Sequence, residues 1–262
     1  MARTGGENMI DFFRNGLAMM ELEVRRIAHD RTELYTRAVQ PILWLVIYGP
    51  IMAEVRAIDT GSIPYVAYIT PGVLLQSTTF ISVFYGLNMV WERESGILKK
   101  LLVTPASRSS IAVGRSMSAG IRAVFQALVI IPVALLVGVR FFPSVPNFVL
   151  AFILIFLSSA GFAALSVCLA SLMKTRERFM GIGQAITMPL FFASSALYPI
   201  ALMPKAIQYF AVINPMSYSV DAVRALMVSG ALASLPEDIM AILLFDALTF
   251  CAASVMLRRI IE

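Results

Sequence analysis

Hydrophobic positions in this chain run in long stretches that no charge interrupts. No charged residue stands between Asp59 and Glu92, between Arg122 and Arg140, between Arg140 and Lys174, or between Arg178 and Lys205. Each stretch is long enough for a helix that crosses a bilayer core of ~30 Å at 1.5 Å per residue. Helices of soluble cores show a polar face every few residues, and these stretches do not. The pattern therefore predicts an all-α polytopic membrane protein.

Six spanning helices account for the apolar stretches. We place them at about residues 34–53, 65–90, 111–139, 148–173, 179–197 and 239–257. Pro41 lies within the first span and is expected to kink it. Together they form one transmembrane domain over residues 34–262, which follows a distinct N-terminal segment at residues 1–33.

The N-terminal segment has the pattern of an amphipathic helix. Apolar residues recur every three or four positions over residues 9–31, at Ile10, Phe13, Leu17, Met20, Val24 and Ile27. A charged amphipathic helix directly before a span is typical of a helix that lies in the membrane interface. A helix packed on a soluble partner would give the same pattern. The early arginines and the missing continuous apolar core argue against a signal peptide.

The stretch 198–236 differs from the spans because it contains four prolines and two short amphipathic pieces, at about 205–212 and 216–228. Asn214 followed by Pro215 predicts a helix start, since Asn caps well and Pro suits the first helical position. The pieces are too short to cross a bilayer. We interpret them as re-entrant or surface-lying helices.

Composition and charge agree with this interpretation. The chain is 59% hydrophobic and 14% charged, against about 45–50% and 25% in ordinary soluble domains. Sixteen of its twenty-one Lys and Arg fall within residues 1–37, 93–115, 174–178 and 258–259, and four fall in the opposite set of segments, at Arg56, Arg140, Lys205 and Arg224. The positive-inside rule then puts both termini in the cytosol of a cell whose plasma or inner membrane holds the protein. The formal charge of +5 needs no nucleic-acid partner.

Motifs for catalysis are missing from the sequence. There is no G-x-x-x-x-G-K-[ST] phosphate loop, no H-E-x-x-H and no G-x-S-x-G. Cys168 and Cys251 fall in apolar segments as packing residues, and His29 falls in a charged interfacial stretch. We expect no enzyme activity from this chain alone, no catalytic residue, no metal and no bound cofactor.

Two charged residues fall deep inside predicted spans, Arg122 and Asp246, whereas Arg37 and Arg115 lie within the first five residues of theirs. Ion-coupled transporters usually carry several such groups, so the count disfavours that class. The two residues could lie at similar depth, and we predict that they pair within one subunit or across a dimer. In the alternative, Arg122 extends to the cytosolic interface while Asp246 is protonated or faces a wet cavity.

The charged block at residues 91–110 predicts a short cytosolic helix with an apolar stripe. Ile97, Leu98, Leu101 and Leu102 form the stripe, while Lys99 and Lys100 cover the other face. Such a stripe must be buried against either the membrane surface or a partner domain. Lipid docking prefers purely basic flanks, so the mixed charge of Glu92, Arg93 and Glu94 favours a protein partner.

Two motifs carry a resemblance to a known family. E-R-E-S-G-I-L-K-K-L-L-V-T-P at residues 92–105 and N-P-M-S-Y-S-V-D-A-V-R at 214–224 resemble segments of ABC-2 type transport permeases. The resemblance implies a homodimeric exporter subunit that works with two separate ATPase subunits, which would hold ATP and Mg. The implied coupling helix contains Glu92, Arg93, Glu94, Gly96, Leu98, Lys99, Leu101, Leu102, Thr104 and Pro105. Lys174, Arg176 and Arg178 would form a second contact.

Further sites are expected on the same basis. We assign Asn214, Pro215, Tyr218, Asp221 and Arg224 to an extracytoplasmic gate. Asp221 and Arg224 are predicted to lie one helical turn apart on the same face of a helix, as an exposed pair. The sequence of the first motif is closer to that of exporters of amphiphilic drugs or lipids. The alternative is an exporter of lipid-linked polysaccharide, and a further alternative is an ion-coupled transporter. Aromatic residues that could line a substrate pathway are Phe80, Phe84, Tyr85, Phe191, Phe192 and Tyr198. Ordinary packing or lipid contact would equally explain them.

Overall fold

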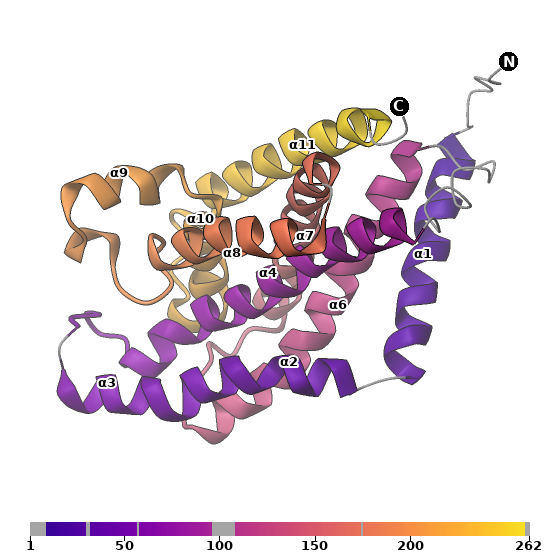
Figure 1. The fold of residues 1–262 in the computed structure, drawn as a ribbon. Coiled ribbons are helices and arrows are strands. Elements are labelled where there is room, and N and C mark those ends of the chain that lie inside the picture. The colour runs from indigo at the N-terminus through magenta and orange to yellow at the C-terminus, as the bar shows by residue number, and fades with distance from the viewer. Residues whose placement is uncertain (1–8, 30–31, 57, 96–107, 174, 260–262) are drawn as a thin grey trace, which may run out of the picture.

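The computed structural model describes residues 9–29, 32–56, 58–95, 108–173 and 175–259, and the regular structure within these ranges is helical (Figure 1). The elements are α1 (Met9–His29), α2 (Thr32–Leu43), the π-helical η1 (Trp44–Tyr48), α3 (Gly49–Val55), α4 (Tyr65–Glu94), α6 (Arg108–Leu136), α7 (Val145–Leu172), α8 (Arg176–Phe192), the 3-10 helix η2 (Ile200–Leu202), α9 (Lys205–Ile213), α10 (Pro215–Arg224), the π-helical η3 (Ala225–Ser229) and α11 (Leu235–Arg259).

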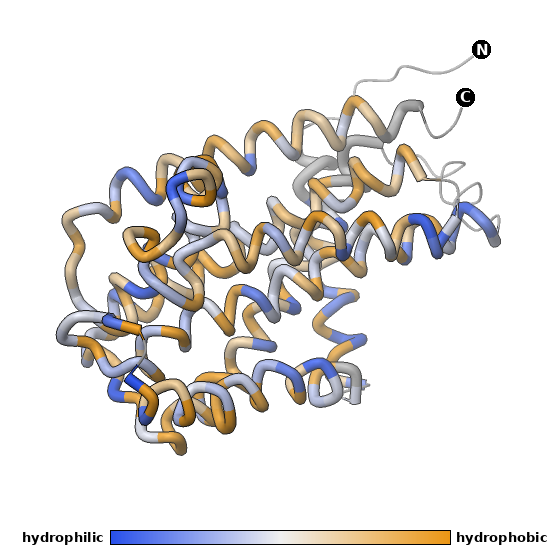
Figure 2. Tube along the Cα trace, turned by 60° about the vertical axis from the view of Figure 1, so that its left-hand side comes forward, coloured by the Kyte–Doolittle hydropathy of each residue, from blue (hydrophilic) through white to orange (hydrophobic). Residues whose placement is uncertain are grey.

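Five helical stretches of the described chain are long and apolar enough to cross a membrane. They are Leu34–Val55, Tyr65–Glu94, Val113–Leu136, Val145–Leu172 and Leu235–Met256. Hydrophobic residues predominate along their length (Figure 2). These five correspond to five of the six predicted spans. The predicted span at 179–197 corresponds to α8, which is only 17 residues long and begins with Arg176, Glu177 and Arg178.

Helix α8 nevertheless runs antiparallel to α4 along most of its length. Arg176 at the start of α8 pairs with Glu94 at the end of α4. Near the other end, a Cβ added to Gly72 of α4 would overlap the backbone of Ala196, just beyond α8. We call the end of the bundle where Glu94 meets Arg176 the Glu92 end, and the end where Gly72 meets Ala196 the Arg224 end.

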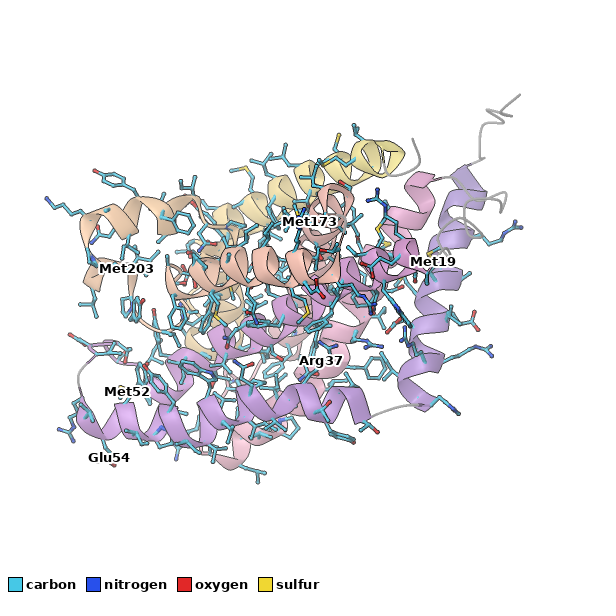
Figure 3. All side chains as sticks on the ribbon, viewed as in Figure 1. Met19, Arg37, Met52, Glu54, Met173 and Met203 are labelled. Atoms are coloured by element: carbon cyan, nitrogen blue, oxygen red, sulfur yellow. The ribbon has the colours of Figure 1, made fainter. Side chains whose placement is uncertain are left out.

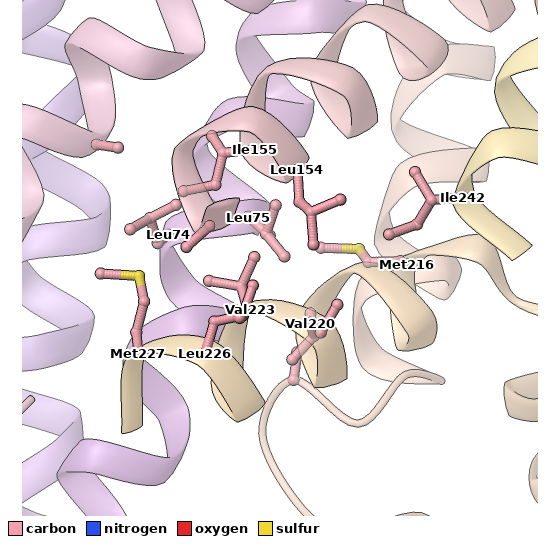
Figure 4. Packing of buried hydrophobic residues seen from close by; sticks show 14 of the residues in the cluster. Leu74, Leu75, Leu154, Ile155, Met216, Val220, Val223, Leu226, Met227 and Ile242 are labelled. Carbon is pink, nitrogen blue, oxygen red and sulfur yellow. The ribbon is translucent and has the colours of Figure 1, made fainter. Parts of the chain in front are cut away.

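Helix α7 occupies the centre and packs against α4, α6 and α11. Small buried residues, Ala160, Gly161, Ala163 and Ala164, allow these neighbours to approach closely, as is usual between membrane helices. Figure 4 shows the largest apolar cluster, where leucines of α4 meet residues of α7, α10, η3 and α11. The stretch 215–229 is therefore packed into the bundle rather than lying on its surface.

The first spanning stretch is irregular, as its proline predicts. Pro41 cannot donate a backbone hydrogen bond, and the helix passes into the π-helical turn Trp44–Tyr48 a few residues later. Proline and π-helical turns are both recognised causes of helix bending. The stretch ends at Arg56, which adopts a left-handed conformation with φ of 51°.

Helix α1 crosses the Glu92 end of the bundle at a steep angle to the long helices (Figure 1). Met19 lies against Gly114 of α6, and Glu23 and Ile27, each four residues further along, are buried. Two members of the predicted apolar stripe, Leu17 and Val24, are 63% and 39% exposed. The buried face of α1 thus shares Ile27 with the predicted stripe but leaves Leu17 and Val24 outside it.

Candidate functional site

Ion pairs hold the Glu92 end together. The Glu92 carboxylate pairs with Arg115 at the start of α6. Glu94 accepts a hydrogen bond of 2.8 Å from Arg176 Nε, and Arg93 donates to the Met173 carbonyl at 3.5 Å. The ends of α4 and α7 and the starts of α6 and α8 are thereby linked. Four residues predicted to couple to a partner (Glu92, Arg93, Glu94 and Arg176) lie together here.

The remaining predicted coupling residues have different outcomes. Arg178 is exposed in the first turn of α8, where its backbone N–H donates to the capping Thr175 hydroxyl at 3.5 Å. The others lie outside the described residues: Gly96, Leu98, Lys99, Leu101, Leu102, Thr104, Pro105 and Lys174. The coupling helix at 92–105 stays a prediction. Its first residues, Glu92, Arg93 and Glu94, belong to the last turn of α4.

The prediction that Arg122 pairs with Asp246 is wrong within one chain. Arg122 instead pairs with Glu23 of α1, with Nη2 2.5 Å and Nε 2.7 Å from Oε1. The two side chains are 7% and 8% exposed. The face of α1 that packs on α6 places the Glu23 carboxylate beside Arg122. The two residues are 99 positions apart in the sequence, so no local pattern indicates the pair.

Asp246 lies elsewhere, buried against α7. Its carboxylate oxygens have no hydrogen-bond partner among the described residues. A Cβ added to Gly161 would overlap Oδ1, so the absence of a side chain at Gly161 makes room for the carboxylate. Because Asp246 is 5% exposed, the Arg122 of a second copy could reach it only if the chain opened.

At the other end, Arg224 joins three segments of the chain. Its Nε donates to the Tyr68 carbonyl of α4 at 3.2 Å, and its Nη2 donates to the Ser195 carbonyl at 2.6 Å. Its Nη1 pairs with Asp221 at 2.5 Å, one helical turn away as predicted. The guanidinium carbon also lies 3.8 Å from the centroid of the Tyr68 ring. The prediction that this pair is exposed is wrong for Arg224, whose side chain is 9% exposed.

Asn214 serves two helices at once. Its Oδ1 accepts from Met216 N at 3.0 Å and so caps α10, with Pro215 in the first turn as predicted. Its Nδ2 donates to the carbonyls of Leu190 and Ala193 at 2.7 and 2.9 Å, which satisfies the end of α8. Tyr218 donates its hydroxyl to the Val212 carbonyl at 2.5 Å. The predicted gate residues thus have clear structural contacts, while gating itself stays a prediction.

Two of the six candidate pathway aromatics, Phe80 and Phe84, line a groove along α4. A cavity of about 350 Å³ lies on the α2 side, and one of about 240 Å³ on the α8 side. Both cavities are lined by Gln40, Phe80 and Phe84, so they adjoin. Arg37 lies on the side of α2 that faces α4 (Figure 3), with its guanidinium carbon 3.9 Å from the Phe84 ring centroid.

The other four aromatics lie elsewhere. Tyr85 points toward α6, where its hydroxyl donates to the Ser118 carbonyl at 3.4 Å. Phe191 is 1% exposed and packs edge-on against Trp44 and Phe192. Tyr198 donates its hydroxyl to the Phe192 carbonyl at 2.6 Å. The structure therefore does not bring the six aromatics together around one pathway.

Sequence reasoning missed three polar residues of interest, Glu23, Arg37 and Ser77. Arg37 and Ser77 were available as polar positions in or beside predicted spans, a signal that membrane helices keep polar groups for internal use. Glu23 could have been found from its spacing of four with Met19 and Ile27. Within the described ranges, no three His, Cys, Asp or Glu residues are grouped so that they could hold a metal ion.

Apolar helices of spanning length, a groove and an ion-paired end are features expected of a membrane transport protein. Comparison with known families agrees, because the model of the ABC-2 type transporter family matches residues 15–228. The chain belongs to this family, which confirms the resemblance seen in its two motifs and makes it a transport permease of the ABC class.

Similar proteins include transport permeases from several organisms. The chain is 28% identical over 195 residues to a putative transport permease, ycf38, of Cyanophora paradoxa. It is 27% identical over 202 residues to a probable multidrug ABC transporter permease, YbhR, of Escherichia coli, and 26% identical over 213 residues to a probable doxorubicin resistance ABC transporter permease protein, DrrC, of Mycobacterium tuberculosis. These alignments cover 74%, 76% and 80% of this chain and 67%, 54% and 75% of the relatives.

Proposed function

We propose that this chain is the membrane subunit of an ABC exporter, moving an amphiphilic drug-like or lipid substrate outward. Two separate ATPase subunits hydrolyse the ATP, and the permease acts as a homodimer in a plasma or inner membrane. The observation that carries the proposal is the ion-paired Glu92 end, where two ion pairs, Glu92–Arg115 and Glu94–Arg176, tie α4 to α6 and α8. A force applied between α4 and α6 at this end would be passed to the helices of the bundle. ATP binding shifts the equilibrium between the inward-open and outward-open states of the dimer through contacts that differ between these states.

The course of α8 supports a sixth crossing, although α8 falls short of the length of a spanning helix. From Arg176 beside Glu94 to Ala196 beside Gly72, the chain covers the same length of the bundle as α4. Helix α7 ends beside Arg93 and α11 returns toward the Glu92 end, which supports a crossing by α8 between them. We therefore propose six spans with both termini cytosolic. The exposed Leu17 and Val24 of α1 would then contact interfacial lipid.

The amphiphile is favoured over lipid-linked polysaccharide for two reasons. The multidrug and doxorubicin resistance names of relatives support an amphiphilic substrate. A sugar pathway would need aromatics that present their faces, yet Phe191 is buried and Tyr85 points toward α6. An ion-coupled mechanism loses support because the chain belongs to an ABC family.

Cysteine labelling tests the proposed topology. In a Cys251→Ser background, Asp59→Cys and Lys205→Cys should react with an impermeant maleimide applied to intact cells, because both positions are exposed near the Arg224 end. Glu177→Cys, exposed at the Glu92 end, should react only after permeabilisation. Buried Cys168 provides the unlabelled background. Reaction of Glu177→Cys in intact cells would overturn the orientation.

Coupling to an ATPase is tested on the predicted stripe. Leu98→Asp with Leu101→Asp should abolish co-purification of the ATPase subunit, or reduce substrate-stimulated ATP hydrolysis by about tenfold or more, since two charges cannot be buried in an apolar cleft without a large cost. The double variant should still insert and dimerise. Leu98→Met with Leu101→Met is the matched control and should behave as wild type. Normal complex formation by the Asp variant would show that the stripe faces lipid.

A further inference from the structure

The groove along α4 has two chemically different walls. On the α2 side it is lined by polar groups, including Arg37, Gln40 and Gln76. On the α8 side most lining residues are apolar, including Leu87, Phe179 and Met180, and the polar ones, Gln40, Gln184 and Thr187, are uncharged. The two cavities of about 350 and 240 Å³ are of the size of small-molecule sites. The charge at Arg37 and the apolar majority beside α8 favour a ligand with a polar part beside α2 and an apolar part beside α8.

Charge identifies the polar part. Arg37 is the one charged residue among the described residues that line the two cavities, and none of these lining residues is a carboxylate. Its guanidinium is placed over the Phe84 ring, which forms part of both cavities. Guanidinium groups recognise phosphate and carboxylate through paired, charge-assisted hydrogen bonds. The α2 side therefore complements an anion.

A second observation points to a ligand at the same place. Ser77 also lines the cavity on the α2 side, and it is 6% exposed. Its hydroxyl oxygen has no hydrogen-bond partner within the described chain. Buried hydroxyl groups in proteins are nearly always paired. An acceptor oxygen in the cavity would supply the partner that the protein does not.

From these observations we propose that the groove binds an amphiphile with an anionic head group, and that Arg37 determines the selectivity for that head. The head lies between Arg37 and Ser77, and the apolar tail lies over Leu87, Phe179 and Met180. This inference rests on the permease function proposed above, and it names the class of substrate that the groove would bind.

The test compares two fluorescent lipids that differ only in their heads. Purified permease is titrated with NBD-labelled phosphatidylglycerol, which is anionic, and NBD-labelled phosphatidylcholine, which is zwitterionic. Wild type should bind the anionic probe about tenfold more tightly. Arg37→Gln should reduce this preference to about twofold or less, mainly by weakening the binding of phosphatidylglycerol, and Arg37→Lys should retain part of it. Arg26→Gln, which removes an exposed charge from α1, is the matched control and should keep the full preference.

Competition experiments with wild type keep the proposal testable if Arg37→Gln does not fold. Dodecyl phosphate should displace the anionic probe, whereas dodecyl phosphocholine and inorganic phosphate at equal concentration should not. Displacement by inorganic phosphate would show a simple anion site and overturn the amphiphile. Equal binding of both lipids, or no binding because a second copy covers the groove, would also overturn the inference. The binding and competition experiments use the permease without an ATPase, so their outcome tests only this inference. The proposed function is tested by the labelling and coupling experiments instead.

Discussion

Replacing Arg122 with Leu should lower the free energy of unfolding by about 3–5 kcal/mol, because it leaves the Glu23 carboxylate buried without its partner. Glu23→Leu should have an effect of similar size. The double replacement should recover most of the loss, since removing both charges of a buried pair is often nearly neutral. Unfolding of the purified permease in mixed micelles, followed by circular dichroism, measures all three variants.

The exposed pair Glu21–Arg25 on the same helix is the matched control. Its side chains are 63% and 76% exposed, so removing either charge should change stability by about 1 kcal/mol or less. If Arg122→Leu were as mild as Arg25→Leu, the buried pair would contribute nothing to holding α1 on α6. A double variant as unstable as the worse single variant would show that the two residues do not interact.

The second large effect is expected at Arg224. Arg224→Leu removes hydrogen bonds to the Tyr68 and Ser195 carbonyls and leaves both buried acceptors short of a donor. Bonds to charged groups contribute about 1.5–3 kcal/mol each, so the free energy of unfolding should fall by about 3 kcal/mol. Arg224→Lys should recover only part of this, because one ammonium cannot reproduce a planar guanidinium that donates in three directions.

Two controls separate this network from surface charge. Asp221 is 36% exposed, so Asp221→Asn should cost about 1 kcal/mol or less. Lys205→Gln removes an exposed cation near the same end and should have no measurable effect. In whole cells, Arg224→Leu should also make residues 204–228 sensitive to external protease, whereas wild type resists. Rapid cleavage of the wild type throughout this stretch would mean that it is a loose loop.

The spans could be predicted from the sequence because apolar length is a local property. Five predicted spans coincide with helices of suitable length and hydropathy. The remaining predicted span, 179–197, was harder to predict. Helix α8 starts with three charged residues, and the chain leaves helical geometry at Ala193, four residues before the predicted end. Helix α10 was predictable from two residues, since the Asn214 cap and Pro215 act within one turn.

The side-chain partners could not be predicted in the same way. Depth along a span placed Arg122 and Asp246 at similar levels, but it carries no information on which helix faces which. Arg122 found Glu23 because α1 folds across α6, a contact between residues 99 positions apart. Similarly, the exposure expected for Arg224 came from its hydrophilic character. Only the packing of α10 into the bundle shows that its guanidinium serves buried carbonyls.

The double use of Asn214 has a consequence for where this part of the chain can lie. A helix end usually has to reach water or lipid head groups, because its last carbonyls and first N–H groups need partners. Here one amide provides for the last turn of α8 and the first turn of α10. These two helix ends therefore carry their own substitute for solvent. They can lie below the membrane surface without leaving these backbone groups unpaired.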